Sequence, residues 1–482
     1  MKTAQHTVEK IGGTSMSQYA SVRDNIILGG RPTVEKFNRI FVVSAYSGIT
    51  NRLLEHKKNG QPGIYALFAQ SMQSEAWKAA IADLRTEMTR LNAELFSHSS
   101  SLNEANAFIE QRINDAEACL DGLLQLCGHG HFELGVHLET VREMLASLGE
   151  AHSAWNTARL LNEDGIPARF VDLTGWQTHS HITLDERIQE AFVSLDLSKE
   201  FPIVTGYAHS QRGLMKSFNR GYSEMTFSRL AVLTQAKEAI IHKEFHLSSA
   251  DPGIVGEKNA VPIGRTNYDV ADQLANLGME AIHPRAAKGL RKNDIALVVK
   301  NTFEPKHPGT LITTGFTREK PQVEIITGCT DIYAFTLFDQ DIAGNFHEYD
   351  QDIVETIQQC KAHIVSKGVN ANTITHYINA NLQTIKRIRA RLLERYPDAE
   401  IDQQRVAFVS AIGSNMTIPG IMARATGALS ARNINILATG QSMRQVDINF
   451  IVSESDYEAT IRSLHRVLVE EDVPRGSIAN AA

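Results

Sequence analysis

The hydrophobic positions near the N-terminus mark strands that end in small or polar residues. Thr7 to Ile11 has the pattern of a short strand and is followed by Gly12-Gly13 and a helix-compatible stretch. Arg39 to Ala45 (RIFVVSA) is a second candidate for a buried strand, and a helix is expected from about Thr50. Strand, tight polar turn and helix in succession are typical of an α/β sheet whose loops handle phosphate at the strand ends.

From Gly63 to Gly128 the pattern is helical. Leu84, Met88, Leu91 and Leu95 recur at the spacing of one helix face. We expect a helical insert whose apolar face packs on the rest of the domain, because core packing is the usual reason for such a face. A helical lid is the alternative.

Strand patterns resume beyond the insert and alternate with helical ones, notably the helix Asp269 to Leu277. The strand candidates are Ala168 to Asp172, Pro202 to Tyr207, Glu238 to Phe245 and Asp294 to Lys300. The alternation ends near Gly309 to Ile312, and the polar stretch Thr313 to Pro321 has the composition of a linker. We therefore expect an open, mainly parallel α/β sheet with helices on both faces in residues 1–315.

Two units of similar pattern follow the linker. Val323 to about Tyr396 and Arg405 to Glu470 each predict the order βαββα. We expect two α+β repeats, at about 322–397 and 403–473. Such units leave strand edges free for pairing.

Composition and charge exclude several classes of protein. Apolar residues make up 43% of the chain, charged residues 21%, and the formal net charge is -7. This is globular usage without a basic block, so neither nucleic acid nor a membrane is an expected partner. Four cysteines lack metal-ligand spacing, and neither a signal peptide nor a spanning apolar run is evident. A cytoplasmic protein with free thiols is the expectation.

The strongest local motif is Lys10-Ile11-Gly12-Gly13-Thr14-Ser15. Two glycines after a strand let the backbone approach a phosphate, so that successive N–H groups can point at it. Thr14 and Ser15 add hydroxyl groups, and Lys10 adds a compact positive charge. A simple connecting turn is the alternative for this motif taken alone. A G-x-x-x-x-G-K-[ST] motif does not occur, which argues against a P-loop fold.

Several motifs in order resemble the aspartate kinase family. They are KIGGTS at 10–15, VVSAYSGITN at 42–51, Gly149-Glu150 with Ser153, Thr205-Gly206-Tyr207, the run from Asn267-Tyr268 through His283-Pro284-Arg285 to Asn301–Pro305, and Gly309-Thr310. The second C-terminal repeat resembles an ACT domain, and aspartate kinases end in two of these. The resemblance covers nearly the whole chain apart from the 63–128 insert and a weakly matching first repeat.

The resemblance implies an amino-acid-kinase fold and transfer of a phosphoryl group from ATP, with Mg²⁺, to the β-carboxylate of L-aspartate. It implies catalytic roles for Lys10 and Glu224. Substrate-binding residues by the same resemblance are Thr50, Glu150, Tyr207, Arg220 and Ser223. Those for the nucleotide and its phosphates are Lys10, Gly12, Gly13, Thr14, Ser15, His242, Lys243, Ser248 and Asp251, and no side chain is assigned to a metal.

The expected chemistry fits these residue types. A carboxylate with a pKa of about 3.9 is already ionised at neutral pH, so its phosphorylation needs no general base. The site must instead bring two anions together and stabilise charge on the moving phosphoryl group. Arg220 can bind the α-carboxylate in a bidentate fork. Glu150 and Glu224 can face the α-ammonium.

The chain departs from the family at informative positions. Asn219, Tyr222 and Glu224 replace two glycines and the aspartate of the usual Gly-Arg-Gly-Gly-Ser-Asp stretch. In the nucleotide segment His242-Lys243 replaces a Thr-Asp pair, while Gly253 and Glu280 stand where an arginine and a lysine are common. The blocks RGYSEMTFSR at 220–229 and HKEFHLSSAD at 242–251 resemble the variant associated with ectoine synthesis.

Two other functions are compatible with parts of this pattern. One is a kinase for another acidic amino acid, such as glutamate or N-acetylglutamate. The other is a catalytically impaired, amino-acid-sensing regulatory protein, which the altered nucleotide segment alone supports. We also expect a homodimer or a larger even-numbered oligomer held through the ACT-like repeats.

Overall fold

The computed structural model describes residues 6–29, 36–57, 59–70, 75–177, 182–211, 213–218, 221–279 and 281–471. The chain divides into two compact units. The first combines Met1–His246 with Ile282–Thr314, and the second combines Leu247–Ala281 with Gly315–Ala482. The predicted α/β domain of residues 1–315 includes residues 247–281, which this division groups with the C-terminal repeats.

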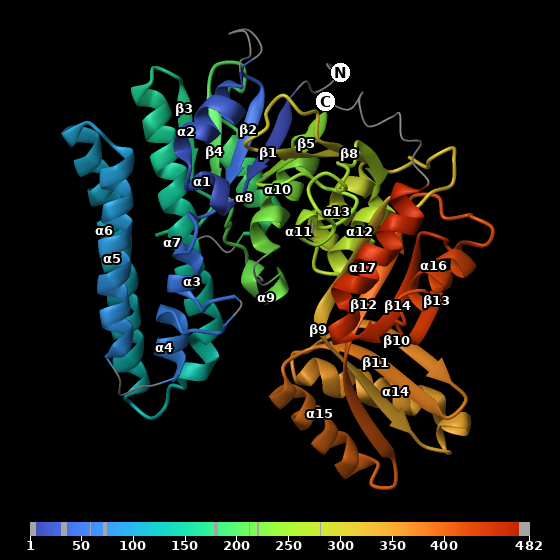
Figure 1. Ribbon diagram of the computed structural model, residues 1–482. Coiled ribbons are helices and arrows are strands. Elements are labelled where there is room, and N and C mark those ends of the chain that lie inside the picture. The colour runs from blue at the N-terminus through green and yellow to red at the C-terminus, as the bar shows by residue number, and fades with distance from the viewer. Residues whose placement is uncertain are drawn as a thin grey trace. The chain divides into compact units, whose positions relative to one another are not determined.

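The first unit is built on an open, mostly parallel sheet (Figure 1). Its strands follow one another in the order β3-β4-β2-β1-β5-β7-β8, with β8 antiparallel to β7. All five residues of β2 and all five of β4 are buried, as expected for parallel strands covered on both faces. The strands are β1 (Thr7–Ile11), β2 (Arg39–Val43), β3 (Ala168–Val171), β4 (Phe201–Thr205), β5 (Glu238–Lys243), β7 (Ala296–Asn301) and β8 (Thr310–Thr313).

The register of β1 decides which side chains share a face of this sheet. Lys10 lies beside Val42 and Ile241, whereas Ile11 lies beside Val43 and His242. Neighbouring residues of paired strands point to the same face, and successive residues point to opposite faces. Lys10 and His242 therefore face opposite sides of the sheet.

Helices cover both faces of the sheet in the first unit. α7 packs on β3 and β4, and α10 packs on β1, β2 and β5. The helices are α1 (Gly13–Met16), α2 (Tyr19–Ser21), the π-helix η1 (Val22–Leu28), α3 (Ile49–Leu53), α4 (Ile64–Gln70), α5 (Ala76–Leu95), α6 (Ser99–Cys127), α7 (Leu134–Glu163), α8 (Leu184–Phe192), α9 (Leu214–Phe218), α10 (Tyr222–Leu233) and α13 (Pro284–Lys292). None of the helices in the described part of the chain combines the length and apolar character needed to cross a membrane.

The predicted insert consists of α4, α5 and α6, and it packs against α7. On α5 the buried face includes Leu84 and Met88, as the spacing predicted, but it continues through Asn92. Leu91 and Leu95 are only partly buried. α7 contacts both α6 and the sheet, which explains why most of its residues from Glu143 to Leu161 are buried.

The second unit is built on an antiparallel sheet ordered β10-β11-β9-β12-β14-β13. Its first repeat is β9 (Ile325–Phe338), α14 (Ile342–Gln359), β10 (His363–Asn370), β11 (Thr373–Asn379) and α15 (Leu382–Arg395). Its second repeat is β12 (Glu400–Ile412), α16 (Ile421–Ser430), β13 (Ile436–Gln441), β14 (Asp447–Ser453), the 3₁₀-helix η4 (Glu454–Asp456), α17 (Tyr457–His465) and the π-helix η5 (Arg466–Glu470). The predicted order βαββα is present twice.

The two repeats pair through β9 and β12, so that one sheet runs through both. Each repeat has a core of its own. Phe335, Ile353 and Ile388 belong to the core of the first, and Val409, Phe450 and Leu464 belong to the core of the second. The segment 247–281 joins this unit and contains α11 (Pro252–Val255), β6 (Arg265–Asn267) and α12 (Tyr268–Asn276).

Candidate active site

The loop after β1 needs glycine for close backbone contact. A Cβ atom on Gly13 would lie 2.5 Å from the carbonyl oxygen of Ala45, which follows β2. The N–H group of Gly12 donates to the carbonyl of His242 at 3.4 Å and so ties the loop to β5. The ends of three adjacent strands are thereby drawn together at the carboxyl edge of a parallel sheet, where ligands bind in folds of this kind.

Lys10 and Glu224 form an ion pair at this edge. Nζ of Lys10 lies 3.6 Å from Oε1 of Glu224, and their side chains are only 12% and 11% exposed. Glu224 lies in the first turn of α10, and its Oε2 accepts a hydrogen bond from the N–H group of His283 at 2.5 Å. Glu224 is therefore held from two sides, and it holds the ammonium group of Lys10 in turn.

Glu150 is a buried carboxyl group on α7. Its Oε1 accepts a hydrogen bond from the hydroxyl of Ser223 at 2.6 Å. Its Oε2 makes no hydrogen bond of regular geometry within the described residues. A Cβ atom on Gly206, just after β4, would lie 2.8 Å from that oxygen, so glycine is what leaves room for it. A buried, unpaired carboxylate oxygen is suited to a donor supplied by a ligand.

Burial raises the pKa of Glu150 from its usual 4.5 to about 8. The hydrogen bond from Ser223, the charge of Lys10 and the nearby backbone N–H groups of Tyr207 and Ala45 oppose this rise, but they do not cancel it. Glu150 is therefore largely protonated at neutral pH until a positive charge reaches it. An arriving ammonium group would favour the carboxylate form.

The hydroxyl residues of the first loop differ in their surroundings. Ser15 is fully buried, and its Oγ lies 2.9 Å from Oγ1 of Thr302, the residue after β7. Thr14 is exposed, and Thr50 in α3 is partly buried. The side chain of Ser15 thus links the loop to the end of β7. Of the two hydroxyl residues in the loop, Thr14 is the one that is exposed to solvent.

His242 lies on the opposite face of the sheet from Lys10, in a buried charged cluster. Its Nε2 lies 2.8 Å from Oε2 of Glu9, and Nε of Arg39 donates to Oε1 of Glu9 at 2.6 Å. Arg39 also donates to the carbonyl groups of Ile26 and Ile27 in η1. The predicted nucleotide residue His242 thus directs its imidazole into the protein. Its carbonyl group accepts the hydrogen bond from Gly12.

The pKa values in this cluster follow from its pairing. Burial would raise the pKa of Glu9, but Arg39 and His242 together hold it well below its usual value. Burial lowers the pKa of His242, although Glu9 opposes this effect. Arg39, His242 and Lys300 also line a small cavity of about 200 Å³. Glu9 and Arg39 were not among the predicted residues. They are 30 residues apart in the sequence, and they meet because β1 pairs with β2, which no local pattern indicates.

Lys243 follows His242 and therefore lies on the same face of the sheet as Lys10. Its carbonyl group accepts a hydrogen bond from the N–H group of Thr302 at 2.8 Å. Ser248 and Asp251 belong to the second unit. There Asp251 caps α11 by accepting from the N–H group of Gly253 at 2.8 Å, and Ser248 donates to the carbonyl group of Ala250. Their part in a nucleotide site stays a prediction.

Tyr207 is buried, and its hydroxyl group donates to Oε2 of Glu143 on α7 at 2.6 Å. Burial, followed by the charge of Glu143, raises the pKa of this phenol well above its usual value. Oε1 of Glu143 accepts from the N–H group of Lys216 in α9. The ring of Tyr207 meets that of Tyr222 edge-on at 5.6 Å. Tyr207 thus contacts the first residue of α10. Arg220 itself, with Asn219 and Glu280, lies outside the described residues.

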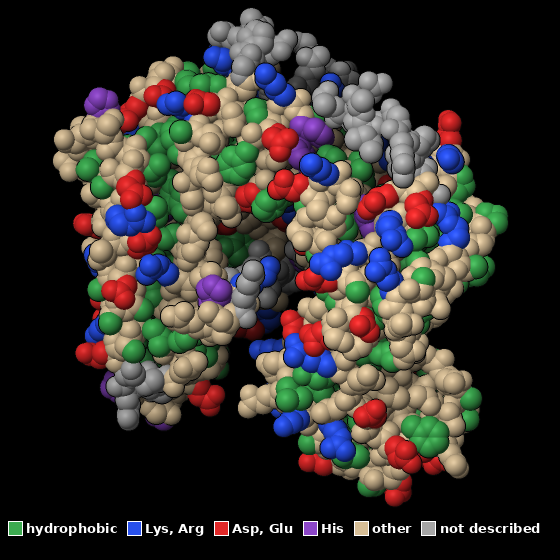
Figure 2. Space-filling model, in the orientation of Figure 1, with side chains coloured by type: hydrophobic (Ala, Val, Ile, Leu, Met, Phe, Trp, Pro, Cys, Tyr) green, Lys and Arg blue, Asp and Glu red, His purple; other side chains and the backbone are tan. Residues whose placement is uncertain are grey.

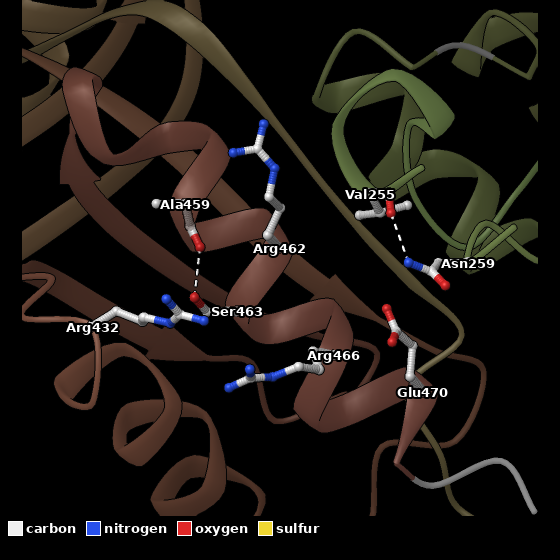
Figure 3. A pocket seen from close by; sticks show the side chains of 8 residues that line it. All are labelled: Val255, Asn259, Arg432, Ala459, Arg462, Ser463, Arg466 and Glu470. Atoms are coloured by element: carbon white, nitrogen blue, oxygen red, sulfur yellow. Dashed lines mark hydrogen bonds between the residues drawn. The ribbon is translucent and has the colours of Figure 1, made fainter. Parts of the chain in front are cut away.

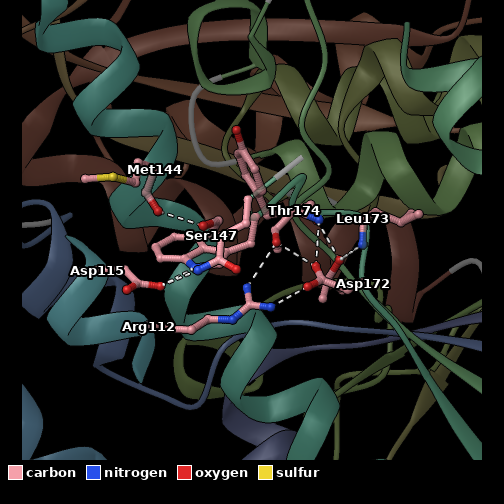
Figure 4. A network of polar contacts seen from close by, with 11 residues as sticks. Arg112, Asp115, Met144, Ser147, Asp172, Leu173 and Thr174 are labelled. Carbon is pink, nitrogen blue, oxygen red and sulfur yellow. Dashed lines mark hydrogen bonds and ion pairs between the residues drawn. The ribbon is translucent and has the colours of Figure 1, made fainter. Parts of the chain in front are cut away.

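A second polar network ties the insert to this region (Figure 4). Arg112 on α6 forms an ion pair with Asp172, just after β3, and donates to Oγ1 of Thr174 at 3.1 Å. The N–H group of Leu173 donates to Oγ1 of Thr205, which donates to the carbonyl group of Tyr207 at 2.8 Å. These hydrogen bonds connect the insert to the end of β4. The helical pattern of residues 63–128 predicted packing of the insert but gave no indication of this polar connection.

Within the residues that the structure describes, three or more His, Cys, Asp or Glu side chains do not gather in a group that could hold a metal ion. Charged side chains of both signs are mixed over the visible surface (Figure 2). The arrangement at the carboxyl edge of the first sheet instead offers one held ammonium group, one buried carboxyl group with a free oxygen, and a glycine-rich backbone. These features can bind and orient a charged substrate.

Comparison with known proteins supports the same interpretation. The amino acid kinase family matches residues 5–301, and the ACT domain family matches residues 409–468. The protein named Aspartate kinase Ask_Ect from Stutzerimonas stutzeri (strain A1501) is 52% identical over 467 residues, which cover 97% of this chain and 98% of that protein. An aspartokinase of Candida albicans is 22% identical, with coverage of 96% of this chain and 90% of the relative.

Solved structures share the fold at low sequence identity. Escherichia coli aspartokinase III in complex with aspartate and ADP superposes with a TM-score of 0.71 at 17% identity, covering 96% of this chain and all of that one. The aspartate kinase of Clostridium acetobutylicum gives a TM-score of 0.67 at 18% identity, again over 96% of this chain. The α/β sheet followed by paired repeats is thus the architecture of these enzymes.

Proposed function

The chain belongs to the aspartate kinases of the amino acid kinase family, and from that membership we propose a role in the reaction for each site residue. The enzyme transfers a phosphoryl group from ATP to the β-carboxylate of L-aspartate and forms 4-phospho-L-aspartate. This is the first step toward aspartate-family amino acids or ectoine. The similarity of the 220–229 and 242–251 blocks to the ectoine-associated variant agrees with the 52% identical relative.

The single observation that carries the assignment of residues is the Lys10–Glu224 pair beside Glu150. Nζ of Lys10 lies 3.6 Å from Glu224, and its charge acts on the carboxyl group of Glu150. A cation at the end of β1 stabilises negative charge as it spreads over the moving phosphoryl group. Glu224 fixes the direction of that cation. Glu224 is therefore a positioning residue for Lys10. Its place in the motif implied a second role, in which its carboxylate faces the α-ammonium group of aspartate.

We assign Glu150 to the α-ammonium group of aspartate. Its Oε2 is buried and unpaired within the described residues, while Oε1 is already bound by Ser223. An ammonium group there would satisfy the free oxygen and hold the carboxyl group ionised. Arg220, by its place in the motif, would take the α-carboxylate. The substrate would then be held at its α-carbon, with its β-carboxylate free to attack.

The nucleotide is the second substrate, and the glycine-containing loop at residues 12 and 13 is suited to its phosphates because backbone N–H groups in such a loop can point at an anion. Thr14 can add a hydroxyl contact, and Lys243 can add a second positive charge from the same face of the sheet. Mg²⁺ bridges nucleotide phosphates in phosphoryl transfer. Mg²⁺ in such sites is usually bound by substrate phosphates and water together with one or two carboxylates.

For the assembly we propose a homodimer or a larger even-numbered oligomer formed through the second unit. The six-stranded sheet ends in β10 and β13, each with one neighbouring strand. Val369 on β10 is 53% exposed and Leu437 on β13 is 40% exposed. Exposed strand edges with apolar side chains favour pairing with another copy.

For the location of the enzyme we propose the cytoplasm. The free cysteines agree with this reducing compartment.

The substrate assignment is tested with purified enzyme, ATP, Mg²⁺ and hydroxylamine, which traps an acyl phosphate as a hydroxamate. L-aspartate should give the product, and L-glutamate and N-acetyl-L-glutamate should give far less. Equal or greater turnover of either alternative would overturn the choice of aspartate. Absence of turnover with all three would favour the regulatory protein instead.

A further inference from the structure

The second unit contains a cavity of about 320 Å³ between the α11 segment and the last helices of the second repeat (Figure 3). One wall is formed by Val255 and Asn259, which follow Asp251 by a few residues. The facing wall is formed by Arg432, Ala459, Arg462, Ser463, Arg466 and Glu470. All of these residues belong to one compact unit. The cavity is separate from the first-unit site that contains Lys10, Glu150 and Glu224.

Three arginines line the cavity, and their pairing differs. Arg462 on α17 donates to the carbonyl group of Ile254 at 2.9 Å and pairs with Glu458 at 2.5 Å. It therefore joins α17 to α11, and its charge is largely compensated. The guanidinium groups of Arg432 and Arg466 make no ion pair or hydrogen bond within the part of the chain that the structure describes.

Glu470 is the acidic residue of the lining, and it is already engaged. Its Oε1 lies 2.9 Å from Nδ1 of His465. Nε2 of the same imidazole lies 2.9 Å from the hydroxyl group of Ser249. The positive charges of Arg432 and Arg466 therefore exceed the negative charge that the lining supplies. Figure 2 shows Lys and Arg side chains, with acidic ones among them, over the region of α16 and α17.

A small anion would relieve this excess. The planar guanidinium group matches the oxygens of a phosphate in a two-bond fork. A phosphate group carries about -1.5 to -2 charges at pH 7, which two uncompensated arginines can balance. Ser463 is less suited to the task, because its hydroxyl donates to the carbonyl group of Ala459 at 2.7 Å. The side-chain amide of Asn259 donates to the carbonyl group of Val255, so one of its two N–H groups is already engaged.

We propose that this cavity binds a small phosphate-bearing anion through Arg432 and Arg466. The volume exceeds that of a single phosphate ion, so a phosphorylated metabolite and inorganic phosphate share the required chemistry. A ligand here would contact both α17 with η5 and the segment that follows Asp251. It would hold that segment against the second repeat and so connect the repeat to residues near the predicted nucleotide contacts.

Isothermal titration calorimetry on the full chain tests the site. Inorganic phosphate and glycerol 3-phosphate are titrated separately at constant ionic strength, and comparison with a variant that lacks both arginines distinguishes this cavity from the phosphate sites of the kinase centre. The pocket variant is Arg432→Gln/Arg466→Gln. The matched control is Lys386→Gln/Arg389→Gln, which removes the same charge from two exposed positions on α15 of the same unit.

We expect saturable binding of at least one probe to the unaltered protein. The dissociation constant should rise at least tenfold in the pocket variant and change less than twofold in the control. Tighter binding of glycerol 3-phosphate indicates a phosphorylated metabolite, and equal binding indicates inorganic phosphate. Either result supports the site. Lack of saturable binding by both probes, or an equal loss in the control, would overturn it, and neither outcome depends on kinase activity.

Hydrogen exchange supplies a second measurement. Bound phosphate should slow exchange of the backbone N–H groups in residues 252–260 of the unaltered protein, because the ligand holds this segment against α17. The same groups should show no such slowing in the pocket variant. Identical slowing in both proteins would place the phosphate elsewhere and would contradict the proposal.

Discussion

Nζ of Lys10 lies 3.6 Å from Oε1 of Glu224, although more than 200 residues separate the two along the chain. Lys10 lies near the end of β1, which pairs with β2 and β5, and Glu224 lies in the first turn of α10, which packs on those same strands. The pair is nearly buried, so water screens it less than it would a surface pair. This contact places a held positive charge beside the carboxyl group of Glu150.

Lys10→Ala should lower kcat far more than it raises KM for aspartate. The charge of Lys10 acts mainly on the transition state of phosphoryl transfer. We expect a loss of about 10²–10³-fold in kcat, the range found for single electrostatic groups. Steady-state kinetics by the hydroxamate assay measures it. Lys237→Ala, at an exposed position before β5, is the control and should leave kcat unchanged. A larger effect on KM than on kcat would assign Lys10 to ground-state binding.

Glu224→Gln should lower kcat by about tenfold, which is about 1.4 kcal/mol of transition-state stabilisation. The effect is smaller than that of Lys10→Ala because the variant loses the direction of the ammonium group but keeps its charge. The double variant Lys10→Ala/Glu224→Gln should be little worse than Lys10→Ala, since the partner is already gone. Additive losses in kcat would show that Glu224 acts independently of Lys10.

The value of kcat/KM for aspartate should rise with pH and level off above about pH 8, where Glu150 of the free enzyme becomes ionised. Below that pH the neutral carboxyl group attracts the substrate ammonium less. Glu150→Gln should have a raised KM and lack this inflection. The profile should be measured from pH 6 to 9. An unchanged inflection in the variant would assign it to another group.

The same shift has a consequence for stability. The unfolded chain releases this proton near pH 4.5, whereas the folded chain retains it until about pH 8. The unfolded state therefore binds fewer protons in that window, and the contribution of Glu150 to the free energy of unfolding falls as pH rises through it. Glu150→Gln should lose less stability between pH 5 and 8 than the unaltered protein in urea unfolding. Equal slopes would contradict the raised pKa.

Glu9→Gln should destabilise the first unit by about 3–5 kcal/mol, because it leaves the buried guanidinium group of Arg39 without its counter-charge. Glu9 and Arg39 are 0% and 2% exposed. Urea unfolding followed by circular dichroism measures the change. Glu94→Gln removes one of the two acidic partners of Arg90, Glu87 being the other, in an exposed cluster on α5 and should cost no more than about 1 kcal/mol. Similar effects of the two variants would contradict the importance of burial.

Sedimentation velocity should give a dimer or a larger even-numbered oligomer for the full chain. Leu437→Lys on β13 and Val369→Lys on β10 test the two sheet edges separately, because a charge on an edge strand opposes pairing. At least one of them should shift the chain toward the monomer. Val193→Lys, at an 85% exposed position outside the repeats, is the control. A monomeric unaltered protein would contradict assembly through the repeats.

Much of the architecture was evident from local sequence. The pattern of strand, glycine turn and helix around Lys10 to Ser15 predicted both β1 and the loop that follows it. The helical period of 63–128 predicted the insert, and the two βαββα patterns predicted a sheet of paired repeats. These features depend on residues near one another in the chain, so backbone geometry and burial of an apolar face determine them directly.

The tertiary structure decided which side chains meet. In the sequence, His242 and Lys10 both stand at strand ends, and His242 resembled a nucleotide contact. The register of β1 on β5 places them on opposite faces, where the imidazole of His242 contacts Glu9, which in turn pairs with Arg39. The sequence contains no signal for this arrangement, because it depends on the order β2-β1-β5. That order brings together strands up to 231 residues apart, and it follows from burial of the whole sheet rather than from any local pattern.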